Sequence, residues 1–173
     1  IVMDNQIYGL TTGQISPTSM HDMKTKSTPY GSVEFPFNPI TAAIMNGATF
    51  VARTTHTNPK HLLSMMEAAM DHNGFGFIEC LSECTEFYNG AFDASNPRKG
   101  GEFLEVPEDH DPTNETEAYD LAGQPFPGHF GIYYQVNRPS KQDKEKEINA
   151  RFLEKTGDLE DWQILPQNFD AMK

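Results

Sequence analysis

The chain has 173 residues, two cysteines and a formal net charge of −12 at pH 7, with a sequence pI near 4.8. This charge disfavours nucleic acid and anionic membranes as partners, because both are themselves negative. A chain of this length is expected to form one domain with its own hydrophobic core. Two cysteines make no disulfide framework, so we expect a cytoplasmic location, and no apolar run reaches the roughly 20 residues of a membrane span.

The first predicted element is the end of a buried strand over residues 1–4. Because a mature chain rarely begins inside a core strand, we expect a longer polypeptide that extends upstream of Ile1. Residues 5–37 follow as a long loop, since their prolines and glycines interrupt any helical period. Loops of this length inside compact domains are usually functional, so this one is a candidate site.

Two Asn-Pro dipeptides then mark helix starts, with Asn as the cap and Pro at the first helical position. Each helix ends near a glycine and precedes a segment rich in β-branched and aromatic residues, which predicts a strand. The four elements are a helix over 38–47, a strand over 48–54, a helix over 58–74 and a strand over 75–81.

The alternation of these elements predicts an α/β fold with a mostly parallel sheet and helices on both faces. In such sheets a ligand lies at the carboxyl ends of the strands. The loop after Met3 and the loop after Leu81 both fall at that edge.

From about residue 94 the sequence becomes polar, acidic and rich in proline and glycine, which indicates a linker. Residues 109–117 lack the spacing of a calcium loop, so we interpret their carboxylates as solvated surface. Residues 126–139 contain one short strand, and Ser140 caps an amphipathic helix. We therefore divide the chain at residue 95, with a ligand-binding part before it and a polar linker and C-terminal arm over 96–173.

The long loop opens with oxygen ligands directly after the first strand. The side-chain oxygen of Asn5 and the backbone carbonyl of Ile7 are ligands of the kind that Mg²⁺ takes, often together with phosphates. Gly9 through Thr11 would bring N–H groups and a hydroxyl near a pyrophosphate. By spacing alone, a simple strand-to-turn transition explains the same residues.

Cys84 lies just past the strand over 75–81, on the same sheet edge. A thiolate on an edge loop can bind iron or zinc, or act as a nucleophile. By composition alone an inert loop cysteine explains it, and Cys80, inside the strand, is typical of a small buried hydrophobe. Two cysteines cannot form a four-thiolate site, so a cluster would need ligands from outside this chain.

Four segments in order resemble the β subunit of 2-oxoacid:ferredoxin oxidoreductases, and its 2-oxoglutarate branch in particular. They are "VMDNQIYGLTTGQISPTS", "KSTPYGSVEFPFNPI", "ATFVART" and "FIECLSECTEFYNGAFD". The resemblance covers residues 1–95 and says little about residues 96–173. It implies that residues 1–95 are the C-terminal part of a thiamine diphosphate-binding domain.

The resemblance also implies roles for individual residues, although it assigns no catalytic acid, base or nucleophile. Cys84 matches the last ligand of a [4Fe–4S] cluster whose other cysteines lie in the N-terminal part of the β subunit, and Cys80 matches no ligand. Thr12 stands where relatives often have a lysine near the substrate, and Asp4 stands where they have an asparagine. The cofactor positions are Asn5 and Ile7 for magnesium, and Gly9, Leu10 and Thr11 for the diphosphate.

The implied activity is oxidative decarboxylation of a 2-oxoacid, 2-oxoglutarate in this branch, to acyl-CoA and CO2, or the reverse carboxylation. The implied partners are an α subunit that completes the site, a ferredoxin that takes the electrons, coenzyme A and the 2-oxoacid. Two alternatives remain open: a thiamine diphosphate-dependent decarboxylase without a cluster, and a non-catalytic fragment or assembly module. Iron content distinguishes the first alternative from the oxidoreductase.

Overall fold

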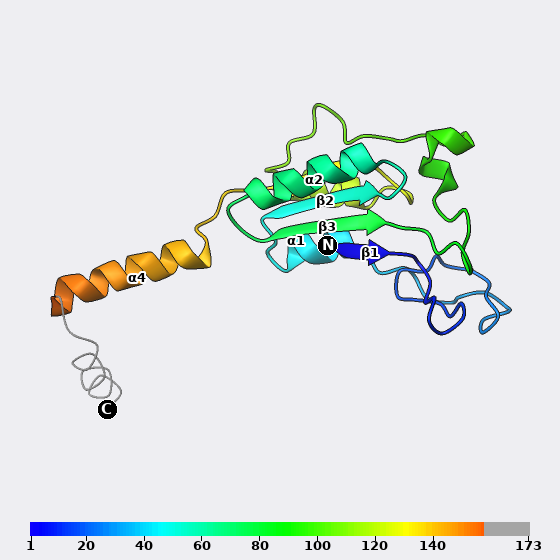
Figure 1. Cartoon of the computed structure of the whole chain (residues 1–173), viewed down its shortest axis with the longest axis horizontal. Helices are drawn as coiled ribbons and strands as arrows, with labels where there is room; N and C mark the ends of the chain where they lie inside the picture. The colour runs from blue at the N-terminus through cyan, green and yellow to red at the C-terminus, as the bar shows by residue number, and fades with distance from the viewer. Residues whose placement is uncertain (158–173) are drawn as a thin grey trace. The chain divides into compact units, whose positions relative to one another are not determined.

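The computed structural model describes residues 1–157, and the chain divides into two compact units, Ile1–Arg138 and Pro139–Lys173 (Figure 1). Residues 158–173 of the predicted C-terminal arm lie outside the described residues. Within residues 1–157, no helix combines the length and the apolar character needed to cross a membrane.

The first unit is built on a four-stranded sheet in the order β1-β3-β2-β4. The strands are β1 (Val2–Asp4), β2 (Phe50–Thr55), β3 (Gly76–Leu81) and β4 (Gly131–Gln135). Strand β3 pairs in parallel with both β1 and β2, whereas β4 pairs antiparallel with β2. The predicted strands and the mostly parallel sheet are confirmed, and the C-terminal strand adds an antiparallel edge. The predicted burial of the first strand is wrong, because β1 lies at the edge of the sheet, where Val2 and Met3 are exposed and Asp4 is buried.

Helices α1 (Pro39–Met45) and α2 (Pro59–Asp71) begin where the Asn-Pro dipeptides predict. Asn38 accepts a hydrogen bond from the Thr41 backbone N–H, and Asn58 accepts one from that of His61, each at 3.2 Å. Helix α2 ends three residues before the predicted stop at Gly74, because His72 turns to an extended backbone. The Nε2 atom of His72 forms a 2.8 Å hydrogen bond with Thr49 Oγ1.

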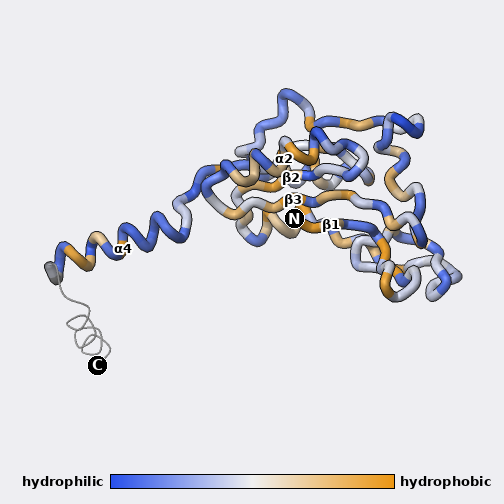
Figure 2. Tube along the Cα trace, viewed as in Figure 1, coloured by the Kyte–Doolittle hydropathy of each residue, from blue (hydrophilic) through white to orange (hydrophobic). Residues whose placement is uncertain are grey.

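Helices cover both faces of the sheet, as predicted, and alternate residues of β2 face opposite layers. Phe50 and Ala52 pack with Ile78 and with alanines and a methionine of α2. Val51 packs on the other face, in a core that includes residues of α1, β4 and the helix α3 (Glu115–Ala122). In Figure 2 the apolar colour gathers along the strands between these layers.

The linker interpretation of the acidic segment is wrong for residues 115–122, which form α3. Asn114 caps this helix, and Ala118 and Ala122 are buried in the core with α1. The surrounding carboxylates dominate the composition, while two small alanines supply the buried face, so the apolar period is hard to recognise in the sequence. The compact unit accordingly extends to Arg138, although the assignment of the cofactor-binding part to residues 1–95 stays a prediction.

The second unit contains α4 (Lys141–Thr156), which begins with the predicted Ser140 cap. Ser140 and Asp143 form a capping box in which each side chain bonds the backbone N–H of the other. The helix is mostly hydrophilic in Figure 2, and Lys141 pairs with Glu145 one turn along. Such i,i+4 pairs add a few tenths of a kcal/mol to an exposed helix (about 0.2–0.5).

Candidate functional site

The loops that follow β1 and β3 start side by side at one edge of the sheet. Asp4 pairs with Leu81 in the parallel register, and the Ser82 backbone N–H donates to the Asp4 carbonyl at 2.9 Å. The Asn5 side-chain Nδ2 donates in turn to the Ser82 carbonyl. Parallel pairing therefore brings together two segments that are 77 residues apart in the sequence.

The buried side chain of Asp4 stabilises the turn that follows β1. Its Oδ1 accepts hydrogen bonds from the Gln6 backbone N–H at 3.0 Å and from Thr18 Oγ1 at 2.6 Å. Gln6 has a φ of 55°, in the left-handed region that non-glycine residues seldom occupy, and Ser19 Oγ donates to its carbonyl at 2.6 Å. Strained backbone of this kind clusters at ligand sites, where the surroundings must hold it in place.

The two proposed magnesium ligands retain unused acceptor atoms in this turn. Asn5 uses its Nδ2 on Ser82, and neither its Oδ1 nor the Ile7 carbonyl accepts a hydrogen bond from any of residues 1–157. Over those residues no cluster of three His, Cys, Asp or Glu side chains can hold a metal ion. A cation here would thus depend on amide and carbonyl oxygens, which suit Mg²⁺ when phosphates supply further ligands.

Gly9 to Thr12 form an exposed tight turn in which several backbone N–H groups have no acceptor among residues 1–157. The Thr12 N–H donates to the Gly9 carbonyl at 3.0 Å, and Leu10 at the tip is 99% exposed. Thr12 is β-branched yet has a φ of 63°, so its backbone is strained. The N–H groups of Gly9, Leu10 and Thr11 donate to no acceptor in the described part of the chain, which leaves three adjacent donors for an anion.

Cys84 lies against this turn. A Cβ atom built on Gly9 would stand 3.6 Å from the Cys84 sulfur, an ordinary van der Waals distance, so the turn and the thiol lie close together. The side chain is half-buried, and the Tyr88 N–H donates to the Cys84 carbonyl at 2.9 Å, which closes the loop around it. Cys80 lies in β3 and is fully buried; burial, followed by the charge of Glu79, raises the pKa of its thiol.

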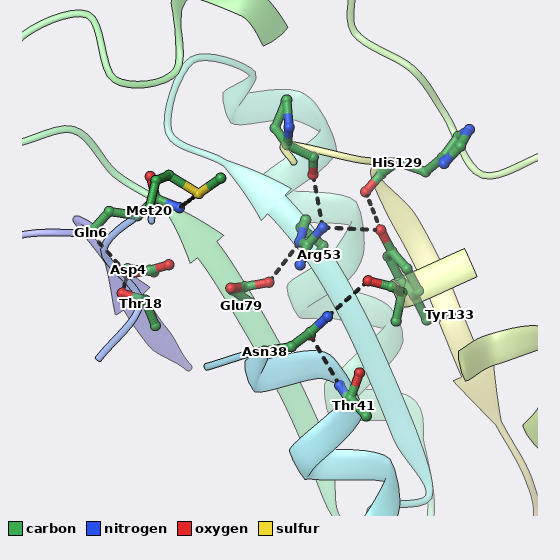
Figure 3. A network of polar contacts seen from close by, with 12 residues as sticks. Asp4, Gln6, Thr18, Met20, Asn38, Thr41, Arg53, Glu79, His129 and Tyr133 are labelled. Atoms are coloured by element: carbon green, nitrogen blue, oxygen red, sulfur yellow. Dashed lines mark hydrogen bonds and ion pairs between the residues drawn. The ribbon is translucent and has the colours of Figure 1, made fainter. Parts of the chain in front are cut away.

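A polar row that sequence reasoning missed crosses the sheet beneath the site (Figure 3). Asp4 on β1, Glu79 on β3, Arg53 on β2 and Tyr133 on β4 lie in that order. Arg53 Nε donates to Glu79 Oε2 at 2.6 Å, with side chains 5% and 1% exposed. Burial disfavours the charge on Arg53, but the charge and hydrogen bond of Glu79, together with Tyr133 and Asp4, outweigh it and raise the pKa of the guanidinium above its usual value.

The sequence does contain a signal for this ion pair. Arg53 and Glu79 each interrupt an otherwise apolar predicted strand, and they are direct partners in the register of β2 and β3. Arg53 Nη1 also donates to the Pro127 carbonyl at 2.8 Å and to the Tyr133 hydroxyl at 3.3 Å. These contacts tie β4 and the loop before it to the strands that position the site.

Comparison with known proteins agrees with the sequence resemblance. Residues 1–80 match the family described as thiamine pyrophosphate enzyme, C-terminal TPP binding domain. The 2-oxoglutarate oxidoreductase subunit KorB of Mycobacterium tuberculosis is 45% identical over 94 residues, which are 54% of this chain and 25% of that protein. The 2-oxoglutarate synthase subunit KorB of Methanothermobacter thermautotrophicus is 30% identical over 157 residues, which are 91% of this chain and 53% of that protein.

A solved structure extends the similarity to the fold. The 2-oxoglutarate:ferredoxin oxidoreductase from Magnetococcus marinus, with 2-oxoglutarate, coenzyme A and succinyl-CoA bound, aligns with a TM-score of 0.78 at 33% identity. The alignment covers 95% of this chain and 56% of that one, so the chain spans about half the length or less of these proteins. The predicted resemblance to these β subunits and the predicted fold are confirmed.

Proposed function

We propose that the chain is part of the β subunit of a cytoplasmic, thiamine diphosphate-dependent 2-oxoglutarate:ferredoxin oxidoreductase. The observation on which this rests is the close approach of the Gly9 turn to Cys84. A cofactor loop and a potential cluster ligand from distant parts of the sequence meet there, and the relatives and the structural neighbour have names of this class.

The residues present fit a magnesium diphosphate. The Asn5 side-chain oxygen and the Ile7 carbonyl would bind Mg²⁺, since both are unused acceptors on a fixed turn. The N–H groups of Gly9, Leu10 and Thr11 would donate to the diphosphate. When bound, thiamine diphosphate supplies a carbon nucleophile for the ketone and accepts the electrons left behind as CO2 departs. The protein's part is to hold that cofactor rigidly against the sheet edge.

Cys84 would supply one thiolate to a [4Fe–4S] cluster. The other ligands would come from residues outside this chain, since its second cysteine, Cys80, is buried in β3. The close approach of Cys84 to the diphosphate turn would set the cluster close to the cofactor, as stepwise electron transfer requires. An α subunit would complete the site, coenzyme A would take the acyl group and ferredoxin would take the electrons.

The test is cofactor and metal analysis of the intact complex, purified without oxygen. We expect thiamine diphosphate, magnesium, iron and acid-labile sulfide. The variant Cys84→Ala should lose the iron and sulfide while it retains thiamine diphosphate. The matched control is Cys80→Ala, which removes the other thiol and should leave the iron content unchanged.

Each contrary result has a defined meaning. Thiamine diphosphate without iron would refute the oxidoreductase and indicate a decarboxylase that has no cluster. Absence of both would refute an enzymatic role and leave a structural or assembly module. Equal iron in Cys84→Ala and in the unmodified complex would refute the assignment of Cys84 alone.

A further inference from the structure

A polar cavity opens beside the cofactor turn. It has a volume of about 210 Å³. Three loops meet around it: the turn at Ile7 and Thr12, the segment that contains Lys24 and Lys26, and the loop after Cys84 at Glu86. It therefore borders Ile7, one of the two proposed magnesium ligands, and Thr12, which follows the proposed diphosphate turn.

Local backbone geometry presents both lysines to this cavity. Residues 22–32 fold back on themselves, because the Asp22 N–H donates to the Ser32 carbonyl at 2.9 Å and the Ser32 N–H donates to the Met23 carbonyl at 3.0 Å. Thr25 and Thr28 close the tip by exchanging backbone hydrogen bonds at 3.1–3.2 Å. Lys24 and Lys26 flank Thr25, and all three residues line the cavity.

The charges around this cavity favour an anion, in a chain whose net charge is −12. Residues 1–138 contain four lysines, and two of them line this one cavity. Neither forms an ion pair within residues 1–157, whereas Lys99 pairs with Asp93 at 3.1 Å. Glu86 is the single carboxylate in the lining, so the two ammonium groups exceed it by one positive charge. Hydroxyls of Thr12 and Thr25 add neutral donors.

We propose that Lys24 and Lys26 form the subsite for the anionic end of the substrate, the distal carboxylate of a 2-oxo dicarboxylic acid. The inference rests on the proposed function and names the residues that select the substrate. The keto end would face the cofactor turn at Ile7, and the distal carboxylate would lie between the two lysines. Thr12, the substrate-side position expected from the sequence, also lines this cavity.

Phosphates of coenzyme A have the same anionic chemistry, and the size of the cavity favours the carboxylate. Pockets that hold whole drug-sized ligands have volumes of about 300–1,000 Å³. A cavity of about 210 Å³ is small for a nucleotide with its phosphates, and it suits a short carboxylate tail.

The test uses the intact complex with the double variant Lys24→Met/Lys26→Met. Two substrates are compared: 2-oxoglutarate, and 2-oxopentanoate, in which a methyl group replaces the distal carboxylate. We expect the KM for 2-oxoglutarate to rise about tenfold or more, since each lost charged hydrogen bond removes roughly that factor. The KM values for 2-oxopentanoate and coenzyme A should stay within about twofold. Lys60→Met, an exposed lysine on α2, is the matched control.

Binding is also measured at equilibrium, without coenzyme A or ferredoxin, so that it does not depend on turnover. The dissociation constant of 2-oxoglutarate should rise in the double variant, and Lys24→Arg/Lys26→Arg should restore most of the affinity. Unchanged 2-oxoglutarate binding would overturn the inference. A raised KM for coenzyme A with an unchanged KM for 2-oxoglutarate would also overturn it, and would assign the cavity to phosphate. Loss of 2-oxoglutarate binding in a complex without oxidoreductase activity would support the subsite and refute only the proposed function.

Discussion

The variant Glu79→Gln tests whether the buried ion pair is as important for stability as its position under the site indicates. It replaces a carboxylate that is 1% exposed and leaves the Arg53 guanidinium buried without its partner charge. Removal of one member of a buried pair typically costs about 3–5 kcal/mol. Arg53 retains the Pro127 carbonyl, the Tyr133 hydroxyl and the nearby charge of Asp4, so we expect the lower end, about 3 kcal/mol.

Thermal unfolding of the purified protein measures this loss. For a chain of this size, about 3 kcal/mol corresponds to a fall in Tm of about 6–12 °C. Glu67→Gln makes the same chemical change at an exposed position on α2, and it should leave the Tm nearly unchanged. Arg53→Met/Glu79→Met removes both charges and should be more stable than Glu79→Gln, because no buried charge is then left unpaired. A Glu79→Gln protein as stable as the unmodified one, or a double variant less stable than the single, would refute this reasoning.

Three further predictions concern the site and its surroundings. Asn5→Ala should weaken thiamine diphosphate and magnesium binding by at least about tenfold in a cofactor titration of the intact complex; unchanged affinity would exclude Asn5 as a ligand. Gly13→Ala should lower the free energy of unfolding by about 1–2 kcal/mol, because φ is 94° and the new Cβ would stand 3.3 Å from Phe87 Cδ1. Gly47→Ala, with a φ of 84° and nothing within 4 Å, should show the backbone part of that loss alone. Burial lowers the pKa of His61 below its ordinary 6.5, so the neutral imidazole stabilises the fold above about pH 6.5. The free energy of unfolding should therefore fall as the pH drops from about 6.5 through the lowered pKa. In urea unfolding at pH 7.5 and below, His61→Gln should reduce this dependence of the unfolding free energy on pH.

Local signals predicted most of the secondary structure. The Asn-Pro starts of α1 and α2 and the Ser140 cap of α4 depend on hydrogen bonds that reach only three residues along the chain. Helix α3 was missed because its buried face consists of Ala118 and Ala122 among carboxylates. The early end of α2 depends on the bond from His72 to Thr49, a residue 23 positions away, which no local pattern reveals.

By itself, the sequence determined that the loops bearing Asn5 and Cys84 begin at one sheet edge, and it predicted which of their residues could bind a magnesium diphosphate or a cluster. Strand alternation and motif spacing are properties of short segments, so they can be recognised along the chain. Only the tertiary structure decided that the Gly9 turn lies close to Cys84, that Arg53 pairs with Glu79, and that Lys24 and Lys26 line the same cavity. These contacts depend on strand register and on how a long loop folds back, and both result from packing between segments far apart in the sequence.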